Sequence, residues 1–143
     1  LASIIKIARV LGVRPGTFLD DNNEMGPVIH RAKDRQHTVT FTSHLTDNHS
    51  HMHFTSLAAR KAGRNMEPFL IDIEPATADK SFSSHEGEEF LYVLEGTVVV
   101  HYGKEKYELH AGDSIYYDSI VEHLVAAGDG SLAKILAVVY APA

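Results

Sequence analysis

The chain has 143 residues, 44% of them hydrophobic, which supports one folded domain with its own core and at most a short appendage. It contains no cysteine. Disulfide bonds and thiolate metal sites are therefore excluded, and any metal site has to use histidine and carboxylate ligands. The absence of cysteine and of a long apolar run predicts a cytoplasmic protein that does not span a membrane, and the net charge of −6 predicts that its bulk repels nucleic acid.

The first 22 residues have a helical pattern. Apolar side chains recur there at helical spacing, at Leu1, Ile4, Ile5, Ala8 and Leu11. Gly12 then stands where helices commonly end, and a polar run at 20–23 ends the segment. Because the chain starts inside this pattern without an initiator Met, we expect that a longer protein has been trimmed. We place a domain boundary here, with 1–22 as one unit and 23–143 as the other.

From about Thr38 the apolar pattern changes to a period of two, which predicts strands. Runs that alternate or are rich in β-formers occupy 69–74, 89–95, 97–102 and 132–140. Gly96, Gly103 and Gly112 supply turns between them. Many short strands with regular turns indicate an antiparallel sandwich or barrel, with jelly rolls among the candidates.

Two stretches carry candidate metal ligands. The run from Ser83 to Gly96 resembles the first cupin motif, in which His85 matches the second histidine, Glu89 the glutamate and Gly96 the glycine. Ser83 stands where the motif has its first histidine. The run 112–123 resembles the second motif, and His123 is its matching ligand. The usual proline and glycine before that histidine are replaced by residues 118 and 120, so the turn there differs from the family's.

The resemblance implies an all-β cupin jelly-roll barrel, a double-stranded β-helix, with a short N-terminal helical segment. His85 and Glu89 are four residues apart, so strand alternation places them on one side, and barrel closure brings His123 opposite them. Two imidazoles and one carboxylate leave open positions on a divalent ion, for which Fe, Zn, Ni and Mn all remain candidates. The alternative is a structural, metal-free cupin in which Ser83 marks a decaying site.

A ligand pocket is expected beside this metal site. Its candidate lining residues are Ser83, Tyr92, Tyr116 and Tyr117. Each tyrosine can present a hydroxyl to a ligand or simply fill the core, and the sequence leaves this open. His49, His51 and His53 alternate along a probable strand and form a second, weaker candidate for metal binding.

The segment 4–13, followed by a turn ending at 18–20, resembles the last helices of a Cro/repressor-type helix-turn-helix domain. Together with the cupin motifs, this order resembles transcription regulators that fuse such a domain to a C-terminal cupin. The resemblance implies a ligand sensor for a small-molecule effector. It also implies a homodimer that binds DNA only through the missing N-terminal part of the parent protein, because the base-reading helix lies before this chain.

A catalytic alternative belongs to a different class. The same His, Glu, His set resembles that of iron-dependent cupin oxidases or isomerases of the hydroxypropylphosphonate epoxidase kind. In such an enzyme the metal activates oxygen or polarises the substrate. No catalytic residue beyond the metal ligands is assigned from the sequence.

Overall fold

The computed structural model describes residues 26–33, 40–42, 52–75 and 82–142. The strands within these residues are β1 (Thr40–Thr42), β2 (Met52–Ser56), β3 (Met66–Ile73), β4 (Glu88–Glu95), β5 (Thr97–Tyr102), β6 (Glu105–His110), β7 (Ser114–Asp118), β8 (His123–Ala127) and β9 (Ala133–Tyr140). The all-β prediction is confirmed, because no α-helix occurs in this described part of the chain. The same residues include no helix long and apolar enough to cross a membrane.

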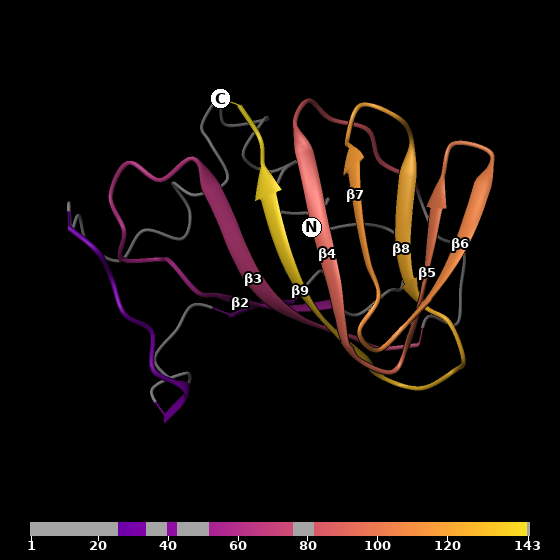
Figure 1. Ribbon diagram of the computed structural model, residues 1–143, viewed down its shortest axis with the longest axis horizontal. Coiled ribbons are helices and arrows are strands. Elements are labelled where there is room, and N and C mark those ends of the chain that lie inside the picture. The colour runs from indigo at the N-terminus through magenta and orange to yellow at the C-terminus, as the bar shows by residue number, and fades with distance from the viewer. Residues whose placement is uncertain (1–25, 34–39, 43–51, 76–81, 143) are drawn as a thin grey trace.

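The strands form two antiparallel sheets that face each other (Figure 1). The larger sheet has the order β1-β2-β3-β9-β4-β7, and the smaller has the order β6-β5-β8. Residues from both sheets meet in one core, which includes Phe54, Phe69, Ile71, Leu91, Val93, Val98, Val100 and Ile135. The period-two pattern of the sequence explains this arrangement, because every second side chain of β3, β4 and β9 is buried.

Two glycines allow close backbone packing near the start and end of β4. Gly96 joins β4 to β5 with a φ of 80°. Gly87 lies just before β4 with a φ of 119°, and a Cβ there would collide with the carbonyl of Tyr140 at the end of β9. Both positions therefore require glycine, the only residue that adopts such dihedrals readily and leaves space for a neighbouring strand. The predicted N-terminal helix and the boundary at residue 22 lie outside the described residues.

Candidate metal centre

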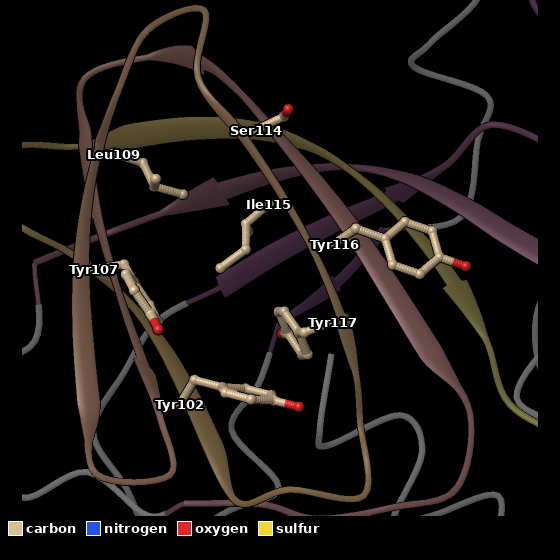
Figure 2. A pocket seen from close by; sticks show the side chains of 7 residues that line it. All are labelled: Tyr102, Tyr107, Leu109, Ser114, Ile115, Tyr116 and Tyr117. Atoms are coloured by element: carbon tan, nitrogen blue, oxygen red, sulfur yellow. The ribbon is translucent and has the colours of Figure 1, made fainter.

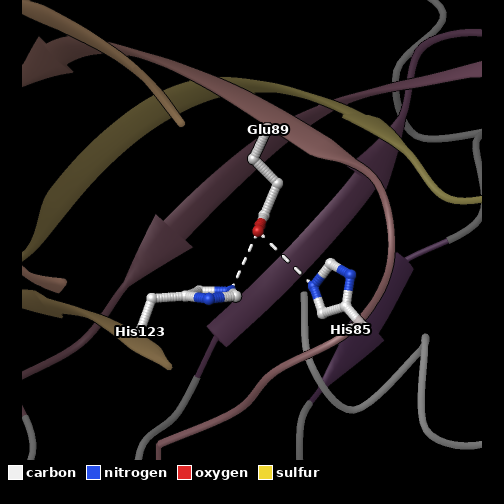
Figure 3. A group of neighbouring side chains, drawn as sticks. All are labelled: His85, Glu89 and His123. Carbon is white, nitrogen blue, oxygen red and sulfur yellow. Dashed lines mark ion pairs between the residues drawn. The ribbon is translucent and has the colours of Figure 1, made fainter. Parts of the chain in front are cut away.

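His85, Glu89 and His123 converge inside the molecule (Figure 3). The Nε2 atom of His123 lies 2.9 Å from Oε2 of Glu89, and the Nε2 atom of His85 lies 3.4 Å from the same oxygen. All three side chains are buried, and one potential ligand atom of each lies within 4.8 Å of the others. The two imidazole rings are 5.3 Å apart at their centroids. The described residues thus present two nitrogens and one carboxylate oxygen to a common point.

Strand pairing fixes the backbone of this cluster. Ser83 and His123 exchange two backbone hydrogen bonds, of 3.0 and 2.9 Å, and form an isolated bridge. The amide of His85 donates to the carbonyl of Ser119 at 3.0 Å. The amide of Ser119 in turn donates to the carbonyl of Gly87 at 2.9 Å. The segment before β4 is therefore held against the segment before β8, which brings the two motifs together.

The outer nitrogens of both histidines have backbone partners. Nδ1 of His123 lies 2.8 Å from the carbonyl oxygen of Val121, and Nδ1 of His85 lies 3.1 Å from that of Glu86. A carbonyl only accepts, so each Nδ1 carries the proton and donates it. Each Nε2 then turns towards Glu89, and Nε2 of His85 makes no hydrogen bond there although it is buried. Nitrogens oriented in this way by outer hydrogen bonds are what a metal ion requires.

The carboxylate of Glu89 is held in its charged form. Ser119, itself fully buried, donates its hydroxyl to Oε2 at 2.8 Å. Burial raises the pKa of Glu89, but the hydrogen bonds from His123 and Ser119, together with the neighbouring His85 imidazole, outweigh it and hold the pKa well below its usual range. Burial alone would lower the pKa of His123. The hydrogen bond to Glu89 and the negative charge of that carboxylate outweigh burial, so the pKa of His123 is raised. Without a metal, the cluster therefore favours a charged carboxylate beside a protonated imidazole.

A cavity of about 330 Å³ lies between the edge strands of the two sheets, β6 and β7 (Figure 2). Its lining is uncharged and consists of Tyr102, Tyr107, Leu109, Ser114, Ile115, Tyr116 and Tyr117. Tyr117 separates this cavity from the metal ligands, because its ring contacts Tyr102 on one side at 5.2 Å and His123 on the other at 5.0 Å. The Tyr117 hydroxyl is buried and has no hydrogen-bond partner. Burial, with the charge of Glu89, raises the pKa of Tyr117, so the hydroxyl keeps its proton.

The residues predicted for a ligand pocket lie in different places. Tyr116 and Tyr117 line the cavity, although Tyr116 points outwards and donates its hydroxyl to Glu88 (Figure 2). Ser83 is half-buried beside His123, with which it pairs. Tyr92 is 38% exposed on the outer face of the larger sheet and is not part of the cavity lining.

The second candidate for metal binding is only partly described. Nε2 of His53, on β2, lies 3.3 Å from Oε2 of Glu74. His49 and His51 lie outside the described residues. Within the described residues, the only group of three or more potential ligands that could hold an ion is the one centred on Glu89.

Sequence reasoning missed two features of the site. Ser119 lies inside the second motif, but a serine in a turn carries no signal that its hydroxyl will reach a carboxylate thirty residues earlier. Tyr107 and Leu109 of β6 also line the cavity. The sequence did not show that β6 lies opposite β7 across this cavity. The pairing of β4 with β7 places Tyr117 opposite Glu89, and the facing of the two sheets brings β6 to the cavity.

The comparisons with known proteins identify the fold. Residues 69–139 match the family model described as a cupin domain. The chain contains a cupin domain. A cupin superfamily protein from Desulfitobacterium hafniense has the same fold, with 16% identity and a TM-score of 0.53 over 64% of this chain and 78% of its own. The predicted cupin fold is thus confirmed.

An enzyme is among the relatives. (S)-2-hydroxypropylphosphonic acid epoxidase from Streptomyces wedmorensis is 28% identical over 96% of this chain and 73% of its own length. A crystal structure of the iron(II) form of HppE superimposes with a TM-score of 0.63 at 27% identity, covering 96% of this chain and 74% of that one. A structure of the S. wedmorensis enzyme with fosfomycin gives a TM-score of 0.59 at 26% identity, over 94% and 72% of the two chains.

These relatives correct the sequence-based interpretation. The prediction of a transcription regulator fused to a helix-turn-helix domain was wrong, because the similarity to an epoxidase extends over 96% of the chain. The expected DNA partner and the sensor role rested on that resemblance and have no support. The expected divalent metal is supported, since three of the described residues are suited to one ion and the relative is an iron(II) protein. Dimerisation stays a prediction.

Proposed function

We propose that this protein is a mononuclear iron(II) enzyme that oxidises or isomerises a small molecule, with His85, Glu89 and His123 as the metal ligands. The observation that carries the proposal is the buried convergence of these three side chains in a chain that resembles an iron(II) epoxidase over 96% of its length. Two histidines and one carboxylate leave open positions on the ion, the set that non-haem iron(II) oxygenases use. Bound iron supplies electrons to dioxygen and polarises a ligated substrate oxygen.

The protein's own groups prepare the site for that chemistry. The carbonyls of Glu86 and Val121 fix the tautomer of each histidine, so both Nε2 atoms are free to ligate. Ser119 orients the carboxylate of Glu89. Burial of all three ligands keeps bulk water away from the reacting centre and strengthens the electrostatic interactions within it.

The ligand pocket forms the second part of this proposal. We assign to Tyr117 the role of hydrogen-bond donor to the molecule at the open coordination positions. An unpaired buried hydroxyl is costly, on the order of 1–3 kcal/mol, and a ligand that accepts from it removes that cost. Ser83 flanks the site, whereas Tyr116 points outwards from β7 towards Glu88, and Tyr92 has no place in this pocket.

The test is anaerobic reconstitution with iron(II), followed by oxygen-uptake assays in the presence of (S)-2-hydroxypropylphosphonic acid, the relative's named substrate, and related small hydroxy acids. We expect one iron per chain and substrate-dependent oxygen consumption. Changing His85 or His123 to Ala lowers iron affinity on the order of 10 to 100-fold and leaves a folded domain. Unchanged iron content in both variants contradicts the site, and the His53→Ala variant is the matched control.

Tyr117→Phe tests the pocket separately. The variant keeps the ring against His123 and removes only the unpaired hydroxyl. Iron content and thermal stability are expected to stay equal to or above wild type, while kcat/KM for the active substrate falls about tenfold or more. An unchanged kcat/KM rules out the donor role of this residue.

A further inference from the structure

A second concave site lies outside the metal centre, in the cavity of about 330 Å³ between β6 and β7 (Figure 2). Four of the chain's six tyrosines line it, namely Tyr102, Tyr107, Tyr116 and Tyr117. The three candidate metal ligands do not belong to this lining. The core of the described residues is mainly aliphatic, and Tyr117 is the one tyrosine among its buried members. A cavity of this volume is of the size that small ligands occupy.

Three of these tyrosines turn their rings to the cavity from different sides (Figure 2). The rings of Tyr102 and Tyr117 lie 5.2 Å apart at their centroids and are tilted by 54°. Tyr107 reaches the cavity from β6, on the same side of the strand as Leu109, and is 44% exposed. The Tyr102 hydroxyl donates to the carbonyl of Asp118 at 3.0 Å, which fixes the direction of this ring. The three rings therefore border a space that solvent reaches past Tyr107.

The charge beside this space is negative. Among the described residues, the side chains that line the cavity are all uncharged. Glu105 projects from the same side of β6 as Tyr107, because alternate residues of a strand share a face, and Lys106 projects from the opposite side. Lys104 belongs to the exposed turn between β5 and β6. A positively charged ligand would thus meet a carboxylate on this face of β6 and no cation in the lining.

We propose that this cavity binds a small organic cation, an ammonium compound whose nitrogen is fully alkylated, between the rings of Tyr102, Tyr107 and Tyr117. Aromatic faces attract a cation that lies within about 6 Å of the ring centroid, and cages of such rings recognise quaternary ammonium groups. The alkyl substituents contact the apolar part of the lining, Leu109 and Ile115. A primary ammonium group is not favoured, because it loses its hydration in an uncharged lining. The site is separate from the metal centre and goes beyond the proposed oxidation chemistry.

A pair of isosteric probes tests the class of ligand. Choline chloride and its neutral isostere, 3,3-dimethylbutan-1-ol, are titrated into the metal-free full chain at constant ionic strength, and NMR shifts of the tyrosine ring protons are followed. Choline is expected to bind about tenfold or more tightly than the alcohol, because the two differ in charge and hardly in shape. Equal affinities would show an apolar pocket without preference for a cation and overturn the proposal. Failure of both compounds to bind at millimolar concentration overturns it as well. Since no metal is present, neither outcome depends on the proposed iron chemistry.

Substitution of Tyr107 tests the location of the site. Tyr107→Leu keeps an apolar side chain and removes the ring, so the affinity for choline is expected to fall about tenfold or more. Tyr107→Phe keeps the ring and should bind choline within about threefold of wild type. Tyr92→Leu is the matched control, because Tyr92 is similarly exposed at 38% but is not part of the lining. Circular dichroism verifies that the variants fold. An unchanged affinity in Tyr107→Leu, or an equal loss in Tyr92→Leu, contradicts the assignment, and the comparison of the two probes in wild type needs no variant.

Discussion

Replacing Glu89 with glutamine removes one charge from the metal centre without creating a cavity. Glu89 is 1% exposed, and the amide has the shape of the carboxylate, so its oxygen still accepts the Ser119 hydroxyl. The binding free energy that the variant loses is therefore the electrostatic attraction between the carboxylate and the metal ion. Removing one partner of a buried charge pair costs on the order of 3 kcal/mol. Since about 1.4 kcal/mol corresponds to a factor of ten, the affinity for iron(II) is expected to fall by roughly 100-fold.

The assay is a competition titration of iron(II) or cobalt(II) against a chelator of known affinity, under anaerobic conditions, with wild type and Glu89→Gln side by side. Glu74→Gln is the control, since that carboxylate contacts His53, away from the cluster. We expect a large loss of affinity in Glu89→Gln, little change in the control, and a folded protein in both cases. Equal affinities of wild type and Glu89→Gln would mean that the carboxylate is not a ligand.

Three further predictions concern the surroundings of the cluster. Ser119→Ala removes a hydroxyl that orients Glu89, and should weaken iron binding about 10-fold or more in the same titration; unchanged binding refutes the orienting role. Gly87→Ala forces a Cβ against the Tyr140 carbonyl at a positive φ, and should lower the free energy of unfolding by about 2 kcal/mol or more in urea; an unchanged midpoint contradicts the close packing described here. In the metal-free protein, the raised pKa of His123 gives stability that is lost as pH rises above the ordinary value of 6.5. The lowered pKa of Glu89 gives stability that is lost as pH falls below its ordinary 4.5. Metal-free wild type should therefore be most stable between these values, and a melting temperature that keeps rising above pH 7 would refute the pairing.

Local patterns were sufficient for several strands and for the three residues that the structure groups as candidate metal ligands. The alternation in 69–74 and the β-rich runs on either side of Gly96 predicted β3, β4 and β5 closely, because each strand buries every second residue. The spacing of His85 and Glu89 predicted one shared side of a strand, whereas His85 lies before β4 and is held near Glu89 by the hydrogen bond from its amide to Ser119. The motif around His123 then supplied the third ligand that the sheets bring into contact.

Long-range pairing was beyond the reach of the sequence. Tyr92 and Tyr117 are both aromatic residues on β-strands, yet one faces outwards and the other contacts His123. Their relative directions depend on the register in which β4 pairs with β7, and a shift of one residue would place both side chains on the same face of the sheet. The interpretation as a regulator failed for a different reason. It depended on an amphipathic pattern in 1–22, and such a pattern specifies a buried helix face but not the kind of domain that contains it.

The most direct test of the metal centre is anomalous diffraction at the iron edge from crystals reconstituted with iron(II). We expect one strong peak between the two sheets, about 2.0–2.2 Å from Nε2 of His85, Nε2 of His123 and a carboxylate oxygen of Glu89, typical distances for nitrogen and oxygen ligands of a first-row ion. A peak at another cluster, such as one that includes His53, or a barrel without a peak, would contradict it.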